Sequence, residues 1–145
     1  MKAYADSSFI VALYLPRESS PRAIAWIESH GKPLPFTPWH RLEVRNAIRL
    51  AAWQQLIDRS QCRIQLKQLD ADLKEESLIV HASIDWTDVL REAEKLGAAH
   101  NVAIGCRSAD LFHVAAARAL GRDTFLTFDT RQAALVKAAG LTVEP

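Results

Sequence analysis

Short apolar runs alternate along the chain with longer segments whose apolar residues recur at the spacing of an α-helix. The apolar runs predict strands at 2–5, 33–37, 78–80, 124–128 and 141–143, of which 78–80 fits either a strand or an extended connection. The amphipathic segments predict helices at 7–15, 21–30, 39–56, 59–76, 87–101, 108–120 and 130–139. Strands that alternate with helices are typical of an α/β fold, in which helices cover both faces of a mostly parallel sheet.

The expected helix boundaries carry residues that start or stop helices. Asp6, Ser7 and Ser8 offer capping side chains at the start of the first helix, and Pro16 ends it. Two hydroxyl residues cap the last two helices: Ser108 and Thr130. Three glycines follow helices, as residues that end them: Gly31, Gly121 and Gly140. No linker, repeat or low-complexity tract interrupts the alternation, so the sequence predicts a single domain over residues 1–145.

Composition narrows the class of protein without indicating a function. The 145 residues are 49% hydrophobic and 24% charged, as expected of a globular domain with its own core. Lys and Arg number 18 against 17 Asp and Glu, so any basic surface that binds nucleic acid must be local. Cys62 and Cys106 are not at a metal-binding spacing, and no apolar stretch approaches the ~20 residues that cross a bilayer. We therefore expect a cytoplasmic protein with no membrane association.

Three aspartates stand where strands end or helices begin. Asp6 follows the first expected strand and Asp129 follows the strand at 124–128, which places both at one edge of a parallel sheet. Asp110 falls in the first turn of the helix that Ser108 begins. Each one alone is explained equally well by helix capping or by the positive end of a helix dipole. Their coincidence at element ends favours a shared site.

Glu43 is the acid that capping does not explain. At ~100° per residue it falls between Leu42, Ala47 and Leu50, so we expect it on the inward side of its helix, where Asn46 could hydrogen-bond it. A buried carboxylate costs on the order of several kcal/mol unless it is paired or binds a metal. If these four acids converge, a divalent cation would offset their repulsion. Oxygen ligands without His or Cys point to Mg²⁺ or Mn²⁺, bound together with substrate phosphate oxygens.

Four segments that together span nearly the whole chain contain these acids. They are Ala5-Asp6-Ser7-Ser8, Leu42-Glu43-Val44-Arg45-Asn46-Ala47, the run from Ser108 to Ala117, and the run from Phe125 to Arg131. In this order they resemble the PIN domain, the nuclease fold of VapC-type toxins. The resemblance implies a three-layer α/β/α fold and a metal-dependent endoribonuclease, usually the toxin of a toxin–antitoxin pair. It makes Asp6, Glu43, Asp110 and Asp129 the catalytic cluster that binds Mg²⁺ or Mn²⁺, with Asp6 and Asp110 as direct ligands. The resemblance leaves open whether the site binds one metal ion or two.

Several other residues receive supporting roles from this resemblance. Ser7 stands where the family often has Thr, which implies a hydrogen bond to the acidic cluster, although capping alone would also account for it. Thr127 lies in the family-like Thr-Phe-Asp arrangement and is assigned a similar role, although a β-branched residue in a strand needs no such reason. Arg107 and Arg131 each lie within three residues of an expected active-site Asp, where they could contact RNA phosphates.

Two surfaces of the helix at 39–56 are candidates for contacts with macromolecules. Arginines recur every four residues on the side opposite Glu43, where they would either approach phosphates or form a solvated face: Arg41, Arg45 and Arg49. An apolar sector of the same helix belongs to the core or forms a groove for another chain: Trp39, Leu42, Leu50 and Trp53. The resemblance implies RNA, a cognate antitoxin and a second toxin subunit in a homodimer as partners.

Other interpretations of the acids come from different classes of protein. The main alternative is a catalytically inactive PIN-like module that binds RNA or another protein. A phosphoacceptor domain would require paired acids before Asp6, and a haloacid-dehalogenase-like phosphatase would require an Asp where Ser8 stands. Neither pattern is present, nor is a P-loop. Transfer, ribosomal and messenger RNA all stay open as substrates, because loop shape selects among them.

Overall fold

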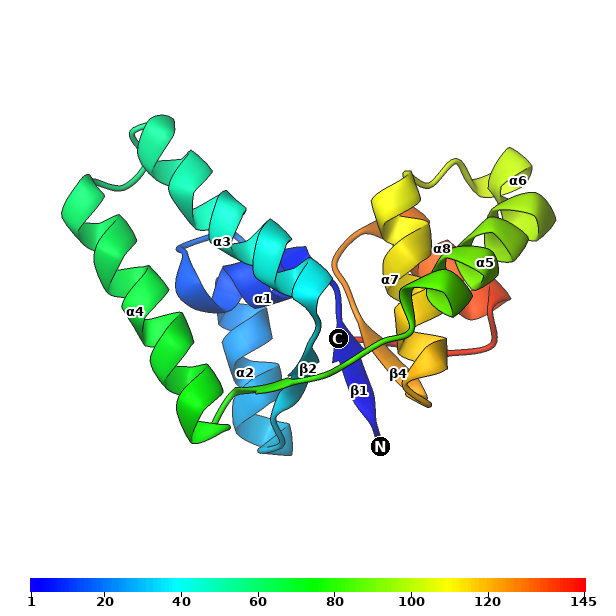
Figure 1. Ribbon diagram of the computed structural model, residues 1–145, viewed down its shortest axis with the longest axis horizontal. Coiled ribbons are helices and arrows are strands. Elements are labelled where there is room, and N and C mark those ends of the chain that lie inside the picture. Colours follow the sequence, from blue (N-terminus) through cyan, green and yellow to red (C-terminus); the bar gives the residue numbers. More distant parts are fainter. The chain divides into compact units, whose positions relative to one another are not determined.

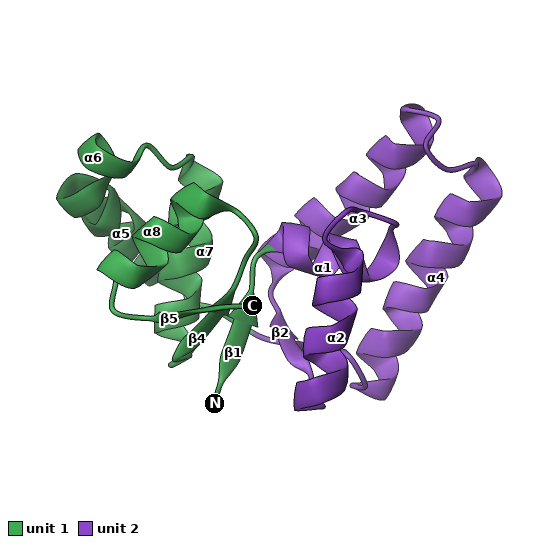
Figure 2. Cartoon of the chain, turned by 180° about the vertical axis from the view of Figure 1, so that it is seen from behind, with its two compact units in different colours: residues 1–6, 83–145 green, residues 7–82 purple.

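The computed structural model describes all 145 residues and divides them into two compact units. The first unit combines Met1–Asp6 with Ser83–Pro145, and the second is Ser7–Ala82 (Figure 2). Each unit contains helices and a parallel sheet, as the alternating pattern predicts. None of the helices is long and apolar enough to span a bilayer. The single domain over the whole chain stays a prediction.

The first unit is built on a three-stranded parallel sheet. Its strands run in the order β1-β4-β5 and are β1 (Ala3–Ala5), β4 (Thr124–Leu126) and β5 (Thr142–Glu144) (Figure 1). Tyr4 pairs in register with Phe125, and both are fully buried. The ladder continues past the end of β1, because the Asp6 amide donates to the Leu126 carbonyl at 3.1 Å. The backbone of Asp6 is thereby fixed beside the end of β4.

Helices of the first unit supply the rest of its core. They are α5 (Trp86–Leu96), α6 (Val102–Ile104), α7 (Ser108–Ala119) and α8 (Thr130–Ala138), with a π-helical turn, η1 (Gly97–Asn101), after α5. The predicted helix at 87–101 thus changes to π geometry in its last turn, and the short α6 was not anticipated. A Cβ at Gly97 would lie 3.2 Å from Leu111 Cδ1, so glycine allows η1 to approach α7 closely.

The second unit is largely helical. Its elements are α1 (Ser7–Tyr14), α2 (Ser20–His30), β2 (Leu34–Phe36), α3 (Pro38–Trp53), α4 (Arg59–Glu75) and β3 (Ile79–His81). Leu34 and Ile79 pair in a two-stranded parallel sheet, and α3 lies beside α4 (Figure 1). Helix α2 ends at Gly31 with a φ of 61°, a left-handed conformation that costs glycine little. Of the stretch at 78–80, Ile79 and Val80 lie in strand β3, which settles it as a strand rather than an extended connection.

Side chains close the starts of α3 and α4 in the same reciprocal way. At α3 the Thr37 hydroxyl accepts from the His40 amide at 3.3 Å, while the Thr37 amide donates to His40 Nδ1 at 3.0 Å. At α4 Asp58 Oδ1 accepts from the Gln61 amide at 2.7 Å, and the Asp58 amide donates to Gln61 Oε1 at 2.8 Å. Both ends are capping boxes, which satisfy backbone N–H groups that a helix start leaves unpaired.

The inward face of α3 differs from the expected one. Leu42 and Leu50, which were expected beside Glu43 on the buried side, are 61% and 45% exposed. The buried residues of α3 are His40, Val44, Ile48 and Ala51. Thr37 hydrogen-bonds both the backbone amide and the ring Nδ1 of His40, which compensates for the burial of this polar residue, and Leu42 lies outside the buried stripe. Glu43 is only half-buried, at the margin of this face.

Candidate functional site

Asp6 is held at the carboxyl edge of the three-stranded sheet by a hydroxyl from the neighbouring strand. Its side chain is buried, and Thr127, the residue after β4, donates to Asp6 Oδ2 at 2.6 Å. The Asp129 amide donates to the same Thr127 oxygen at 3.1 Å. One hydroxyl group therefore contacts the side chain of Asp6 and the backbone of Asp129. The prediction that both aspartates meet at one edge of a parallel sheet is confirmed.

Asp129 also has the ordinary structural role that its position suggested. It caps α8, because its Oδ1 accepts from the Gln132 amide at 2.9 Å, so the cap is Asp129 rather than the expected Thr130. The cap uses one carboxylate oxygen, and the residue is exposed. Capping and ligand binding are thus compatible at this position. The Gln132 side chain is 1% exposed, and its Oε1 lies 2.9 Å from Thr127 Oγ1.

Asp110 is paired with Arg107 at the start of α7. Asp110 Oδ2 accepts from the backbone amide and from Nε of Arg107, both at 3.2 Å, and Arg107 Nη2 donates to Oδ1 at 3.4 Å. The residue before the helix is Arg107, one position earlier than the expected cap Ser108. The Asp110 side chain is 14% exposed and that of Arg107 is 82% exposed. A cation that binds Asp110 must therefore share this carboxylate with a guanidinium group.

The Cys106 thiol lies close enough to the charged side chains of Asp110 and Asp129 for them to affect its pKa. It is buried and donates to the Arg131 carbonyl at 3.4 Å. Burial raises the pKa of the thiol, and the charges of Asp110 and Asp129 raise it further, against the opposing charges of Arg131 and Arg107. Both aspartates thus act on one thiol. A raised pKa favours the neutral thiol of Cys106 over the thiolate that would bind a metal ion.

Asn101 fixes the loop that leads into α7. Its Nδ2 donates to the Cys106 carbonyl at 2.9 Å, and its Oδ1 accepts from the Cys106 amide at 2.6 Å. Both hydrogen-bonding faces of one amide side chain therefore hold one backbone residue. Asn101 is the last residue of η1, and Arg107 follows Cys106 directly. The π-helical turn thus sets the position of the Arg107–Asp110 pair.

Glu43 has its partner within the second unit. Ser7 donates its hydroxyl to Glu43 Oε1 at 2.7 Å, and Ser7 itself is buried. Asn46 is exposed, and its expected hydrogen bond to Glu43 stays a prediction. Ser7 is joined to Asp6 by a peptide bond. The hydrogen bond from Ser7 to an acidic residue is therefore present, while its role in a reaction stays a prediction.

The donor set of these residues fits a hard divalent cation. Carboxylate oxygens are the ligands that Mg²⁺ and Mn²⁺ prefer, and the neutral thiol of Cys106 does not compete for them. No group of three or more His, Cys, Asp or Glu side chains is arranged to hold a metal ion. Asp110 forms an ion pair with Arg107, and Asp6 accepts a hydrogen bond from Thr127. Convergence of all four acids on one cation stays a prediction.

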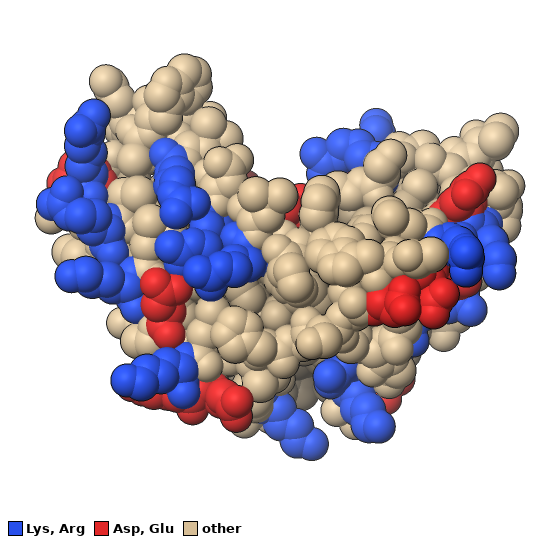
Figure 3. Space-filling view, viewed as in Figure 1, with Lys and Arg blue, Asp and Glu red and all other residues tan.

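Basic side chains gather over α3 and α4 of the second unit (Figure 3). Two of the three arginines expected as a stripe face an acid of the neighbouring helix. Arg45 Nη1 lies 2.8 Å from Asp70 Oδ1, and Arg41 Nη1 lies 4.0 Å from the same oxygen. Arg49 is exposed. This part of α3 is a largely solvated face with an ion pair to α4.

The apolar sector of α3 does not belong to the core. Trp53, at the end of the helix, is 79% exposed, and Leu42 and Leu50 are exposed as well. Trp39 is half-buried, and Leu56, just beyond the helix, is 63% exposed. The interpretation of this sector as core is therefore wrong. Exposed apolar residues mark a contact with another chain where they form a contiguous patch.

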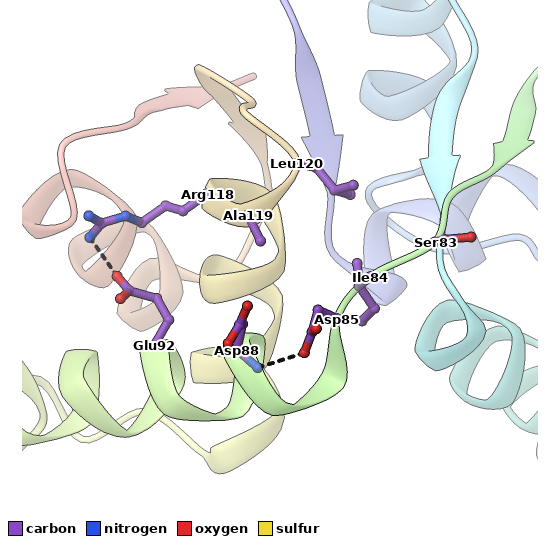
Figure 4. A pocket seen from close by; sticks show the side chains of 8 residues that line it. All are labelled: Ser83, Ile84, Asp85, Asp88, Glu92, Arg118, Ala119 and Leu120. Carbon is purple, nitrogen blue, oxygen red and sulfur yellow. Dashed lines mark hydrogen bonds and ion pairs between the residues drawn. The ribbon is translucent and has the colours of Figure 1, made fainter.

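A pocket of about 460 Å³ in the first unit lies apart from the predicted residues (Figure 4). Its lining comes from the start of α5 and the end of α7 and includes Asp85, Asp88, Glu92 and Arg118. Asp85 Oδ1 accepts from the Asp88 amide at 3.0 Å as the cap of α5, and Arg118 is 3.1 Å from Glu92. These polar groups are thus engaged at helix ends, and none of the predicted site residues lines the pocket.

Sequence reasoning did not single out Gln132 or Asn101. A usable signal existed for Gln132, since an Asp followed three residues later by Gln has the spacing of a capping box. That spacing predicts a helix start at Asp129, but not the contact of the Gln132 side chain with Thr127. Asn101 carries no local signal, because its partner Cys106 is defined by the turn between them.

Comparison with known proteins places the fold. The chain resembles FitAcB from Neisseria gonorrhoeae with a TM-score of 0.67 and 18% identity, over 99% of this chain and 96% of that one. It resembles VapC20 of Mycobacterium tuberculosis, described as a Sarcin-Ricin loop cleaving toxin, with a TM-score of 0.68 and 16% identity, over 99% of both chains. A structure of FitAB bound to an IR36 DNA fragment matches with a TM-score of 0.67 and 17% identity, over 98% of this chain and 93% of that one.

At these identities the solved structures establish a shared fold. A search of curated protein sequences finds no match. The model of the PIN domain family matches residues 3–138, which is nearly the whole chain. The predicted fold class, a PIN-like α/β/α fold with a mostly parallel sheet, is thereby confirmed. The chain belongs to the PIN domain family.

Proposed function

We propose that this protein is a metal-dependent endoribonuclease and the toxin of a toxin–antitoxin pair. The observation that carries the proposal is the buried Asp6 carboxylate at the end of β1, which Thr127 holds from the neighbouring strand, in a chain of the PIN domain family. The likeness to VapC20, a toxin that cleaves the Sarcin-Ricin loop, supports RNA as the substrate class. The likeness to FitAcB and FitAB supports an assembly with a partner protein.

The proposed catalytic cluster consists of Asp6, Glu43, Asp110 and Asp129. Asp6 and Asp110 bind Mg²⁺ or Mn²⁺ directly, and Glu43 and Asp129 complete the negative pocket. When bound, the metal supplies Lewis acidity that offsets charge on the phosphodiester and activates water. Thr127 orients the carboxylate of Asp6 and Ser7 that of Glu43, at hydrogen-bond distances of 2.6 and 2.7 Å. Residues that orient ligands in this way sustain both affinity and rate.

Arg107 and Arg131 are the proposed contacts to RNA phosphates. Both are exposed, and the charges of both act on the Cys106 thiol together with those of Asp110 and Asp129. A guanidinium group binds a phosphate through paired hydrogen bonds. Arg107 has a second function in the proposal, because its ion pair with Asp110 neutralises that carboxylate until a cation and substrate take its place.

The exposed apolar sector of α3 is the proposed docking surface for the antitoxin. Leu42, Leu50 and Trp53 of α3 present exposed apolar surface, and basic side chains gather over α3 and α4 (Figure 3). Copurification of the tagged protein with a small partner, followed by light scattering, tests this assembly and the homodimer. A fully active monomer that copurifies with nothing would contradict both.

Cleavage of RNA by purified, partner-free protein is the decisive test. Structured RNA is incubated with Mg²⁺, Mn²⁺ or EDTA, beside Asp6→Asn protein from the same preparation, and the cut sites are mapped. We expect cleavage that needs the metal and is lost in the variant, which also excludes a contaminating nuclease. RNA binding without cleavage under any metal would instead favour the inactive module, and metal titration by calorimetry would separate that outcome from a narrow substrate range.

A further inference from the structure

The pattern of an Asp followed three residues later by a Gln occurs at the start of both α4 and α8, with different results. At α4 Asp58 and Gln61 form the reciprocal capping box, in which the Gln61 side chain accepts from the Asp58 amide. At α8 only half of this box exists. The Gln132 amide donates to Asp129 Oδ1, but the Asp129 amide donates to Thr127 Oγ1 instead of to Gln132.

Thr127 therefore displaces the Gln132 side chain from the capping role that its position favours. The displaced carboxamide is 1% exposed and lies against the hydroxyl that displaced it, with 2.9 Å between Gln132 Oε1 and Thr127 Oγ1. Its other atom, Nε2, is buried without a hydrogen-bond partner. A buried amide donor left unpaired is costly, so this arrangement requires an explanation.

The single hydrogen of the Thr127 hydroxyl decides the orientation of the carboxamide. Thr127 Oγ1 faces two oxygens, Asp6 Oδ2 at 2.6 Å and Gln132 Oε1 at 2.9 Å, and it can donate to only one of them. A carboxylate is the stronger acceptor and is nearer, so Asp6 receives the hydrogen. Two oxygens would then face each other at Gln132. Because the two ends of a carboxamide have nearly the same shape, the opposite orientation resolves this conflict.

We propose that Gln132 is a positioning residue for Asp6, whose Nε2 donates to Thr127 Oγ1 and thereby directs the Thr127 hydroxyl hydrogen to Asp6 Oδ2. In this arrangement Thr127 Oγ1 accepts from Asp129 N–H and from Gln132, and donates once to Asp6, which uses its full capacity. The carbonyl end of Gln132 takes the unpaired place, which proteins tolerate better than an unpaired N–H.

Gln132 then connects both aspartates of the sheet edge. Its backbone amide holds the Asp129 carboxylate, and its side chain holds Asp6 through Thr127. The inference rests on the proposed function where it concerns metal binding, but the direction of the hydrogen bond is independent of it. Loss of the Gln132 side chain removes one of the two donors that hold Thr127 Oγ1 in place, so the hydroxyl that orients Asp6 as a ligand is held less firmly.

The direction of the hydrogen bond is measured by NMR on metal-free, ¹⁵N-labelled protein. We expect one side-chain amide proton of Gln132 to resonate at the position of a hydrogen-bonded amide and to shift away from it in Thr127→Val, where the buried amide has lost its acceptor. Thr127→Ser, which keeps the hydroxyl, should leave it in place. If Thr127→Val leaves the Gln132 amide protons unchanged, the carbonyl end faces Thr127 and the proposal is wrong.

The positioning role is measured by Mn²⁺ affinity in calorimetry, without RNA, for Gln132→Met beside Gln61→Met. The second variant is the matched control, because it removes the same side chain from the same position of an exposed helix start. We expect affinity to fall about 10-fold in Gln132→Met, the size of effects from groups that orient ligands, and to stay unchanged in Gln61→Met. Gln132→Met combined with Thr127→Val should be no weaker than Thr127→Val alone, because both act through one hydroxyl.

Each result has a definite meaning. Equal Mn²⁺ affinity of the native protein and Gln132→Met, or additive losses in the double variant, would overturn the positioning role while leaving the proposed nuclease intact. Absence of Mn²⁺ binding by the native protein would remove the metal site of the proposed function and the positioning role with it. The NMR result would still decide the orientation of Gln132, so failure of the inference and failure of the proposed function are distinguishable.

Discussion

Each of the two units buries one aspartate against a hydroxyl group. Asp6 in the first unit is 5% exposed and accepts from Thr127 at 2.6 Å, and Asp72 in the second is 9% exposed and accepts from Tyr14 at 2.7 Å. By burial and by hydrogen-bond length the two carboxylates are alike. Neither criterion therefore separates an acid that stabilises the fold from one that acts in a reaction.

The surroundings of the two carboxylates differ. Asp72 lies within α4, where Tyr14 of α1 donates to its Oδ2 and Gln68 donates to its Oδ1 at 2.9 Å, so it joins two helices. Asp6 follows a strand, at the sheet edge where side chains of parallel strands gather in α/β folds. Its hydroxyl partner also contacts the backbone of Asp129. Position in the sheet, more than burial, distinguishes the candidate functional carboxylate.

Replacing each buried aspartate, Asp6 and Asp72, by asparagine is expected to give the largest difference between a role in catalysis and a role in stability. Asp6→Asn should reduce RNA cleavage by at least ~100-fold, a loss typical of removing an active-site electrostatic group, while an amide oxygen can still accept from Thr127. Asp72→Asn should cleave normally but lose about 1–3 kcal/mol in the free energy of unfolding, because its NH₂ group faces a donor. Cleavage assays and urea unfolding measure both. The comparison fails if both variants lose activity to the same extent.

Removal of the Tyr14 hydroxyl tests the structural half of the comparison. Tyr14→Phe leaves Asp72 with one donor in a buried place, so we expect a loss of about 1–3 kcal/mol of stability and unchanged cleavage. Tyr4→Phe is the matched control, since the Tyr4 hydroxyl lies 2.8 Å from ring nitrogen Nδ1 of His113 rather than from a carboxylate. Its loss should be nearer ~1 kcal/mol. A larger loss in Tyr4→Phe would mean that the charge of Asp72 does not set the cost.

The hydrogen bond between Tyr14 and Asp72 predicts that the stability of the protein depends on pH in the alkaline range. Burial, and the Asp72 carboxylate that accepts its hydroxyl, raise the pKa of Tyr14 above its usual 10.0. The neutral hydroxyl is then favoured in the folded chain, so its contribution is fully present below about pH 10 and is lost as the unfolded chain ionises above it. Thermal unfolding between pH 8 and 11 should show a shallower decline in Tyr14→Phe than in the native protein. Parallel curves would contradict the raised pKa.

Removal of Arg107 should have a smaller effect, on the candidate site alone. Arg107→Ala frees the Asp110 carboxylate, so Mn²⁺ affinity should rise by about 1.5- to 5-fold, the worth of an exposed ion pair. RNA cleavage should fall, because a phosphate contact is lost. Arg91→Ala is the control, as Arg91 pairs with Asp88 at the same spacing at a distance of 3.7 Å. Weaker Mn²⁺ binding in Arg107→Ala would show that Arg107 does not compete with the cation.

The exposed carboxylate of Asp123 is expected to give the smallest change in stability. The Lys2 amide, and then the Thr124 hydroxyl, both at 2.8 Å, lower the pKa of Asp123 from its usual 3.8. Its contribution to stability is therefore present above about pH 4 and is lost as the pH falls through the lowered value. The stability difference between native protein and Asp123→Asn should shrink between pH 5 and 2. A constant difference over that range would contradict the lowered pKa.

The sequence predicts most element types, because their boundaries depend on local chemistry. Gly31 ends α2 in the left-handed conformation, and Thr37 with Pro38 begins α3. Asp6 and Asp129 were correctly placed together, since the carboxyl ends of neighbouring parallel strands share one edge. These features need only a few neighbouring residues or a rule of topology.

The face of α3 and the partners of the buried acids could not be predicted in the same way. Helix α3 carries apolar residues on more than one side, so periodicity alone does not show that His40 is buried and Leu42 exposed. The hydrogen bond from Tyr14 to Asp72 joins residues 58 positions apart, and Thr127 reaches Asp6 across 121. Such contacts depend on how whole elements pack, which no local pattern contains.

The position of Asp129 as the cap of α8 has an evolutionary consequence. Asparagine caps helices as well as aspartate does, and a single nucleotide change converts one codon into the other. Under the proposed function, a gene for this chain can therefore lose its harmful activity in one mutational step without loss of the folded protein. Inactive copies would still fold, bind a partner and escape quality control. Natural variants with asparagine at position 129 would thus persist as silent alleles rather than disappear.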